Sequence, residues 1–236
     1  MSAEERLVLR GGALAELGPA RRIREADLWI EGRRVVSVGD PPDGWDGPRP
    51  RAAEVIDCSG CLVLPGLVCG HGHLYSALAT GMPGPAEAPT SFVEILERVW
   101  WRLDEALDQA SLRASALVGA VSALQTGTTC IVDHHASPSF IEGSLDVIAD
   151  ALEEVGLRSV LCYEVTDRGG EERRDAGVRE NERFLGSERP LARGLVGGHA
   201  SFTMGAETLE MCVDLARRKG SGLHVHAAED GADQED

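Results

Sequence analysis

The sequence predicts an α/β protein in which a parallel sheet follows a small antiparallel β module. From residue 62 onward, apolar runs alternate with stretches of helical periodicity, a pattern that indicates a parallel sheet. Residues 1–60 contain short β-like runs separated by turn-rich stretches. All seven histidines fall at the expected carboxyl ends of the later strands, where a parallel α/β barrel collects its functional groups. This coincidence favours a metal centre at one end of the sheet.

The amino-terminal module, residues 1–60, is predicted from four runs that favour strands. They lie at residues 7–9, 27–30, 35–38 and 54–57. Residues 31–34 suit a hairpin link between the second and third runs. We therefore expect an antiparallel arrangement for this part of the chain.

The remaining part, residues 61–236, predicts five strands that alternate with helices. The strands are expected at residues 62–75, 127–133, 158–165, 193–199 and 222–226. Helical spacing marks residues 92–107, 112–124, 145–155, 175–185 and 209–216. Ser111 is a candidate N-cap, and Gly156 and Gly220 suit helix ends.

Acidic side chains outnumber basic ones, 39 to 23, for a formal net charge of −16. Such a charge repels phosphate backbones and anionic membrane surfaces, so neither nucleic acid nor a membrane is an expected partner. No secretory leader pattern opens the chain, and we expect a cytoplasmic protein. Its six cysteines then suit reduced thiols. Cys58 and Cys61 form a lone CxxC pair, for which a structural zinc is the alternative.

The first strand ends in His71, Gly72 and His73. Because side chains alternate along a strand, the two histidines share one face, and Gly72 lets a ligand or backbone come close between them. The fifth strand carries a second such pair, His224 and His226, with Glu229 three residues later. Three imidazoles that leave one coordination position open are typical of a catalytic zinc.

A carboxylate beside such a centre can carry a proton to the leaving group, and we assign this catalytic role to Glu229. The alternative is an ordinary surface acid at the start of an acidic tail. In the long first loop, Tyr75, Met82, Trp100 and Trp101 suit a lid or pocket wall, although the two tryptophans equally suit helix packing.

Several segments resemble a known family. PGLVCGHGH and LHVHAAE are similar to the first- and fifth-strand signatures of the amidohydrolase superfamily. A closer resemblance, to SsnA-like aminohydrolases, spans nearly the whole chain. Its segments are ATGMP, FVEILERVWWRLDEAL, DHHASPSFIEGSLDVIADALEE, SVLCYEVTDR and GGHASFTMGAETLEMC.

The resemblance implies a (β/α)8 TIM-type barrel with a small β-sandwich built from both chain termini. Residues 1–60 would be the amino-terminal part of the sandwich, and residues 61–236 the first five barrel strands. It further implies that His71, His73 and His226 bind the metal and that His199 contacts substrate. No lysine lies on the fourth strand, which points to one divalent metal ion rather than two; zinc is favoured over iron on ligand type.

The sequence allows two interpretations of the neighbouring histidines of the second strand, His134 and His135. The DHHASP stretch favours a substrate-pocket role, which we assign to His134 along with Tyr75. A strand-end polar cluster bonded to neighbouring backbone is the other interpretation.

The family pattern continues past the fifth strand with a histidine on strand six and an aspartate on strand eight, whereas this sequence stops at Asp236. We therefore expect a chain that is inactive and unstable alone, and either a longer natural chain or a second polypeptide that supplies the rest. A homo-oligomer or association with a complementary chain is expected.

The function expected is that of a metal-dependent amidohydrolase acting on C–N bonds other than peptide bonds. It would deaminate or hydrolyse a small nitrogenous ring compound by a metal-activated water. The alternatives are a non-catalytic fragment or split subunit, and a metal-binding regulatory protein that has lost turnover.

Overall fold

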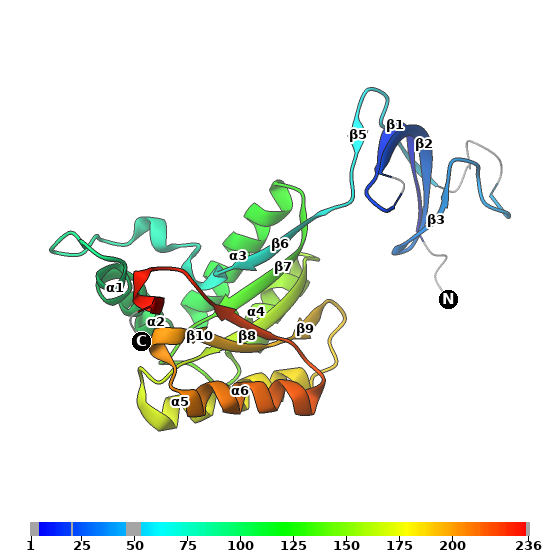
Figure 1. Ribbon diagram of the computed structural model, residues 1–236. Coiled ribbons are helices and arrows are strands. Elements are labelled where there is room, and N and C mark those ends of the chain that lie inside the picture. Colours follow the sequence, from blue (N-terminus) through cyan, green and yellow to red (C-terminus); the bar gives the residue numbers. More distant parts are fainter. Residues whose placement is uncertain (1–4, 20, 46–52, 235–236) are drawn as a thin grey trace. The chain divides into compact units, whose positions relative to one another are not determined.

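The structure is a computed structural model that describes residues 5–19, 21–45 and 53–234. The chain divides into two compact units, Met1–Pro65 and Gly66–Asp236. Figure 1 shows strands β1 to β5 in the first unit, and strands β6 to β11 with the helices in the second.

The first unit is a five-stranded sheet of mixed direction, with the order β3-β2-β1-β4 and with β5 also paired to β1. Its strands are β1 (Arg6–Glu16), β2 (Arg22–Glu31), β3 (Arg34–Val38), β4 (Glu54–Asp57) and β5 (Leu62–Val63). The expected hairpin at residues 31–34 is confirmed, and Gly32 takes a positive φ of 57° in its turn.

The expectation of an all-antiparallel module is wrong, because β4 and β5 run parallel to β1. Two strands joined by a tight turn must pair antiparallel. β4 and β5 are not joined to β1 in this way, because a long connection after β3 precedes them. The buried centre of this unit contains Val8, Trp29 and Trp45, and the indole Nε1 of Trp29 donates to the carbonyl of Gly39 at 2.9 Å. The described residues form one sheet here, so the expected sandwich stays a prediction.

The second unit is a curled, all-parallel sheet with the order β11-β10-β8-β7-β6, to which β9 adds beside β8 (Figure 1). Its strands are β6 (Leu67–Gly72), β7 (Thr128–His135), β8 (Arg158–Val165), β9 (Ala192–Gly194), β10 (Val196–Ala200) and β11 (Leu223–His226). The parallel sheet predicted from the strand and helix alternation is therefore confirmed. Because neighbouring strands are parallel, their carboxyl ends meet at one edge.

Two expected strands are each split in two. The run at residues 62–75 divides into β5, which pairs with β1, and β6, which begins the parallel sheet. The first compact unit includes β5 and extends to Pro65. The run at residues 193–199 divides into β9 and β10, which pair with successive parts of β8.

Helices connect the strands of the second unit. They are α1 (Phe92–Ile95), a π-helical turn (Leu96–Trp100), α2 (Trp101–Ala106), α3 (Gln109–Gln125), α4 (Ser144–Glu154), α5 (Gly170–Leu185) and α6 (Ala206–Lys219). The N-cap of α3 is Asp108, not the expected Ser111. Ser111 is instead its partner in a capping box, and its backbone N–H donates to Asp108 Oδ1 at 2.8 Å.

The core of the second unit lies between the sheet and helices α3, α4 and α5. Its fully buried side chains include Leu112, Leu145, Ile148, Leu152, Leu161 and Phe184. Each such side chain contributes about 1.5–3 kcal/mol when buried, so this layer holds the strand ends in place. Among the helices of the described ranges, none combines the length and apolar character needed to cross a bilayer.

Candidate metal centre

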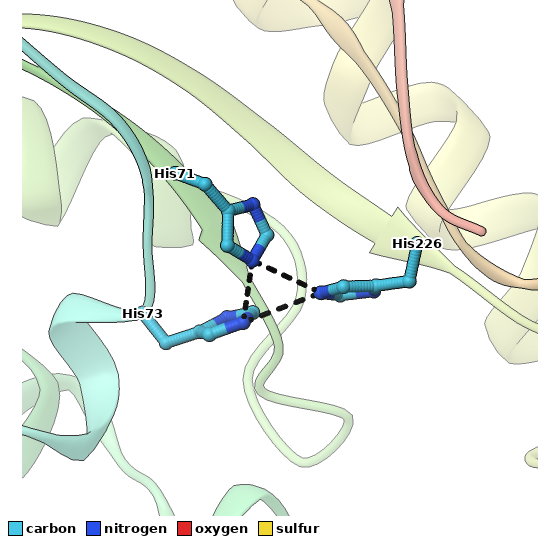
Figure 2. A group of neighbouring side chains, drawn as sticks. All are labelled: His71, His73 and His226. Atoms are coloured by element: carbon cyan, nitrogen blue, oxygen red, sulfur yellow. Dashed lines mark hydrogen bonds between the residues drawn. The ribbon is translucent and has the colours of Figure 1, made fainter. Parts of the chain in front are cut away.

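Three imidazoles from two distant strands converge at the carboxyl edge of the sheet. His71 lies in β6, and His73 is the first residue after that strand. His226 is the last residue of β11. The Nε2 atom of His71 lies 3.2 Å from Nε2 of His73, and Nε2 of His226 lies 3.2 Å from the first and 3.3 Å from the second. Figure 2 shows the three rings pointing their Nε2 atoms at a common centre.

Backbone carbonyls orient two of these rings. Nδ1 of His73 lies 2.7 Å from the carbonyl oxygen of His134, and Nδ1 of His226 lies 3.0 Å from that of His199. A carbonyl only accepts, so each Nδ1 must carry the proton, which leaves Nε2 with its lone pair free. This is the outer-shell arrangement that metal-binding histidines commonly have.

The spacing of the three nitrogens fits a tetrahedral cation. Zinc–nitrogen bonds of about 2.0–2.1 Å at tetrahedral angles place two ligand nitrogens about 3.3–3.4 Å apart. Burial lowers the pKa of His73 and lowers the pKa of His226 to about 3, so both rings are neutral at pH 7, as ligands must be. Lone pairs directed at one point repel each other unless a cation lies between them, and the donor set therefore fits a metal.

A cavity of about 140 Å³ adjoins this triad. It is lined by side chains from the long loop after β6 and from the ends of β8, β10 and β11: His73, Tyr75, Phe92, Leu96, Trp100, Trp101, Asp104, Glu164, His199, His226 and Glu229. The lining combines aromatic rings with carboxylates and imidazoles. Such a cavity suits a flat, polar-edged small molecule.

Glu164 is the buried anion beside the triad. Its carboxylate accepts from Arg168 Nη2 at 3.0 Å and lies 3.4 Å from Nδ1 of His134 and 3.6 Å from Nε2 of His199. Burial opposes ionisation of Glu164, but the attraction of these three neighbours prevails and lowers its pKa. Burial likewise opposes protonation of His134, yet its contact with Glu164 raises the pKa of that imidazole.

The two histidines at the end of β7 occupy different places. The His134 ring lies 4.5 Å from the His226 ring between centroids, and its Nε2 donates to the carbonyl of Gly198 at 3.0 Å. His135 is fully buried on the other side of the strand, where its Nε2 contacts Ser137 Oγ at 2.8 Å. His134 is thus the one that lies beside the triad.

Tyr75 and Trp100 supply two of the aromatic rings of the cavity. The Tyr75 ring is buried and meets the rings of His73 and Trp100 edge-on, at centroid distances of 5.6 and 6.4 Å. Both residues line the cavity. Trp101 also lines it and stacks under the guanidinium of Arg168, 4.6 Å from its ring centre.

Glu229 lines the same cavity from the segment after β11. Burial, followed by the nearby Asp233 carboxylate, raises the pKa of Glu229. The backbone N–H of Glu229 donates to Asp233 Oδ2 at 2.8 Å, which anchors the segment.

Asp104 and Arg168 are site residues that the sequence analysis did not identify. Asp104 is 2% exposed and accepts from Arg168 Nη2 at 3.3 Å. Burial raises the pKa of Asp104 to about 7. One sequence signal could have identified Asp104: it lies four residues after Trp100, and residues four apart share one face of a helix.

Groups of potential ligands in the described ranges centre on the histidines. One is His71, His73 and His226; the other is His134, Glu164 and His226. Cys58 is buried and Cys61 exposed, both are free thiols, and neither belongs to a group of three ligands there. The alternative of a structural zinc on this pair thus has no third ligand among the described residues.

Comparison with known proteins gives a family match and a set of relatives. The model described as "Amidohydrolase family" matches residues 62–236. The chain is 28% identical over 216 residues to a 5-methylthioadenosine/S-adenosylhomocysteine deaminase of Thermococcus sibiricus, covering 90% of this chain and 47% of that protein. It is 29% identical over 210 residues to a 5'-deoxyadenosine deaminase of Methanococcus vannielii, covering 87% and 47%. The chain spans about half the length of these relatives.

Solved structures share the fold. Atrazine chlorohydrolase from Arthrobacter aurescens, complexed with zinc, matches with a TM-score of 0.75 at 22% identity, covering 93% of this chain and 52% of that one. An adenosine deaminase from Xanthomonas campestris with bound zinc matches with a TM-score of 0.76 at 20% identity, covering 95% and 50%. The curled parallel sheet is therefore of the TIM-barrel type found in these proteins.

Proposed function

This chain belongs to the amidohydrolase family, and from that premise we propose that it is the metal-binding part of a hydrolase acting on C–N bonds other than peptide bonds. The observation that carries the proposal is the triangle of Nε2 atoms from His71, His73 and His226, with edges of 3.2–3.3 Å, at the edge of a cavity. Three neutral imidazoles with an open fourth position are the ligand set of a catalytic rather than a structural metal.

His71, His73 and His226 would hold one divalent cation, zinc in preference to iron. When bound, such a cation supplies Lewis-acid chemistry that lowers the pKa of water and so allows hydrolysis at neutral pH. The residues around it then have separate tasks. The carbonyls of His134 and His199 keep the rings of His73 and His226 aimed at the cation.

Glu229 is the proposed proton carrier. Its raised pKa brings the carboxyl closer to neutral pH, which suits a group that must both accept and donate a proton. It lines the cavity together with His199, whose Nδ1 contacts Thr203 Oγ1 at 2.6 Å and whose Nε2 lies 3.6 Å from the Glu164 carboxylate. His199, His134 and Tyr75 are proposed to contact and orient the substrate.

A small aminated nitrogenous ring is the proposed substrate, and ammonia the product. The relatives named above are deaminases of adenosine derivatives. In this chain, the aromatic rings of Tyr75 and Trp100 suit the face of such a ring, and the carboxylates of the same cavity suit its polar edge. The reaction proposed is hydrolytic deamination.

The complete catalyst is proposed to contain more than these five barrel strands. The chain spans about half of its curated relatives, and β6 and β11 are the outer strands of the sheet order. Further strands would close an eight-stranded barrel, complete a sandwich with residues 1–60, and supply the histidine and aspartate of strands six and eight. They would come from the same natural chain, a second copy or a complementary chain.

Partial coverage also supports the alternative of a non-catalytic fragment or split subunit. A split subunit and a non-catalytic fragment are distinguished by mixing this chain with a chain that carries the remaining strands. A split subunit becomes active when a chain carrying the remaining strands is added, whereas a fragment that serves no catalytic purpose stays inactive.

The test uses the whole natural protein that carries this chain. We expect about one equivalent of transition metal per chain and ammonia release from methylthioadenosine or 5'-deoxyadenosine. His73→Ala should lose both, because it removes one ligand of three. Cys61→Ser is the control, since an exposed thiol outside the triad should leave metal content unchanged. Less than about half an equivalent of metal in the unaltered protein would contradict the proposal.

A further inference from the structure

One imidazole near the triad has no role so far. His224 lies two residues before His226 on β11, and its Nε2 lies 2.9 Å from Nδ1 of His71. The two ring centres are 5.0 Å apart, with the planes tilted by 52°. This contact joins β11 to β6, which are the two outer strands of the sheet order.

The direction of this hydrogen bond follows from proton counting. A neutral imidazole has one N–H and one lone pair. If Nε2 of His71 binds a cation, its lone pair is used there, and the proton of His71 must be on Nδ1. Nδ1 of His71 then donates, and Nε2 of His224 accepts.

His71 differs from the other two ligands in the kind of acceptor it meets. His73 and His226 donate to backbone carbonyls, which no substitution removes. In the described ranges, the partner recorded for Nδ1 of His71 is a side chain, so this ligand alone depends on a residue that can be altered. His224 contacts Nδ1 of His71, the ring nitrogen that points away from the triangle of Nε2 atoms. His224 is therefore an orienting group and not a fourth ligand.

We propose that His224 is a positioning residue of the metal centre: by accepting the Nδ1 proton of His71, it fixes the tautomer and the ring direction of that ligand. This inference rests on the proposed function, since it takes His71, His73 and His226 as the ligands. Outer-shell partners of this kind typically contribute about 10–100-fold to metal affinity.

The test measures Co²⁺ affinity and the visible absorption of bound Co²⁺ in the whole natural protein and three variants. His224→Leu removes the acceptor and should weaken Co²⁺ binding about 10–100-fold. His224→Gln offers a carbonyl oxygen at a similar reach and should bind within about threefold of the unaltered protein. Its absorption spectrum should also match, because three histidine ligands remain in the same geometry.

His73→Ala separates the two proposals. If it binds Co²⁺ as tightly as the unaltered protein, the proposed ligand set fails. If it loses binding while His224→Leu stays within about twofold of the unaltered protein, only the role of His224 fails. Equal weakening by the Leu and Gln variants would also overturn that role, because a purely structural defect does not distinguish an acceptor from an apolar group. Thermal unfolding of the metal-free variants checks that both are folded.

Discussion

Asn181 of helix α5 makes two hydrogen bonds to the backbone of Tyr163 in strand β8. Its Oδ1 accepts from the Tyr163 N–H at 2.8 Å, and its Nδ2 donates to the Tyr163 carbonyl at 2.8 Å. Strand β9 pairs with β8 up to Leu161, and β10 pairs with it from Glu164 onward. The Asn181 amide thus takes the place of a strand neighbour where the sheet is interrupted, directly before the buried anion Glu164.

We predict that Asn181→Ala lowers the free energy of unfolding by about 2–4 kcal/mol, because it leaves two buried backbone groups without partners. Urea unfolding followed by circular dichroism measures this. Glu182→Ala, on the same helix, is the control. It removes only a contact at 3.1 Å between partly exposed Glu182 and Lys219, worth at most about 1 kcal/mol. Equal effects of the two substitutions would contradict the bridging role.

Glu180 supplies the N-terminal cap of helix α4 from a different helix. Its carboxylate accepts from the N–H of Gly143 at 3.0 Å and of Leu145 at 3.1 Å, at a terminus where Gly143 offers no side chain. We predict that Glu180→Ala costs about 3 kcal/mol of unfolding free energy, and that Glu180→Gln costs less because one oxygen remains.

Chemical denaturation of the Glu180 variants gives both values. The matched control is Glu154→Ala, which breaks an ion pair with Arg113 on the surface and should cost less than about 1 kcal/mol. A Glu180→Ala protein as stable as this control would show that the capping contact contributes nothing.

Gly197 lies where β10 passes close to β8. A Cβ atom built there would lie 2.3 Å from the carbonyl oxygen of Tyr163, a backbone atom that cannot rotate away. We predict that Gly197→Ala lowers the unfolding free energy by about 1–3 kcal/mol or more. It should also weaken metal binding, because Gly197 is paired with His224 of β11.

Thermal melts and a Co²⁺ titration of Gly197→Ala provide the measurements. The control is Gly84→Ala, where an added Cβ meets nothing within 4 Å and φ is not in the left-handed region. Unchanged stability of both variants would contradict the close approach of β10 to β8 at Gly197.

Asp104 gives a prediction about pH. Burial raises its pKa to about 7 in the folded protein, against an ordinary value of 3.8, and the carboxylates of Glu164 and Glu105 act in the same direction while Arg168 opposes them. Because its pKa is higher in the folded state, the Asp104 carboxyl is protonated more readily there than in the unfolded chain. Its contribution to stability is therefore full below pH of about 4 and is lost as pH rises through about 7.

Compared with Asp104→Asn, which does not titrate, the unaltered protein should lose stability between about pH 4 and pH 7. One pKa unit corresponds to about 1.4 kcal/mol, and we expect at least that difference. Urea unfolding of both proteins at several pH values measures it. Parallel stability curves for the two proteins would exclude a raised pKa at Asp104.

Local patterns predicted much of the fold. The apolar run that predicted a strand at residues 158–165 corresponds to β8, and Gly156 follows α4 with a positive φ of 77°, as its position suggested. The errors occurred where partners far along the chain decide the outcome. Whether β4 runs parallel to β1, or where β5 separates from β6, depends on which strand lies alongside, and periodicity carries no information about that.

In the candidate site, local spacing likewise predicted some features, whereas others depend on contacts between distant parts of the chain. The HxH spacing placed His71 and His73 on one face of a strand, and the second HxH pair placed His224 and His226 on another. Nothing local indicated that Asp104 of α2 meets Arg168 after β8, since their contact depends on how the long first loop folds over the sheet.

By itself, the sequence determined which residue types lie at which strand ends, because alternation along a strand and the 3.6-residue helical repeat depend on near neighbours only. The tertiary structure alone decided that Nδ1 of His71 meets Nε2 of His224 across 153 positions of chain, and that the Nε2 atoms of His71, His73 and His226 share a centre. Those distances are set by sheet register and curl, which arise from packing the whole second unit at once.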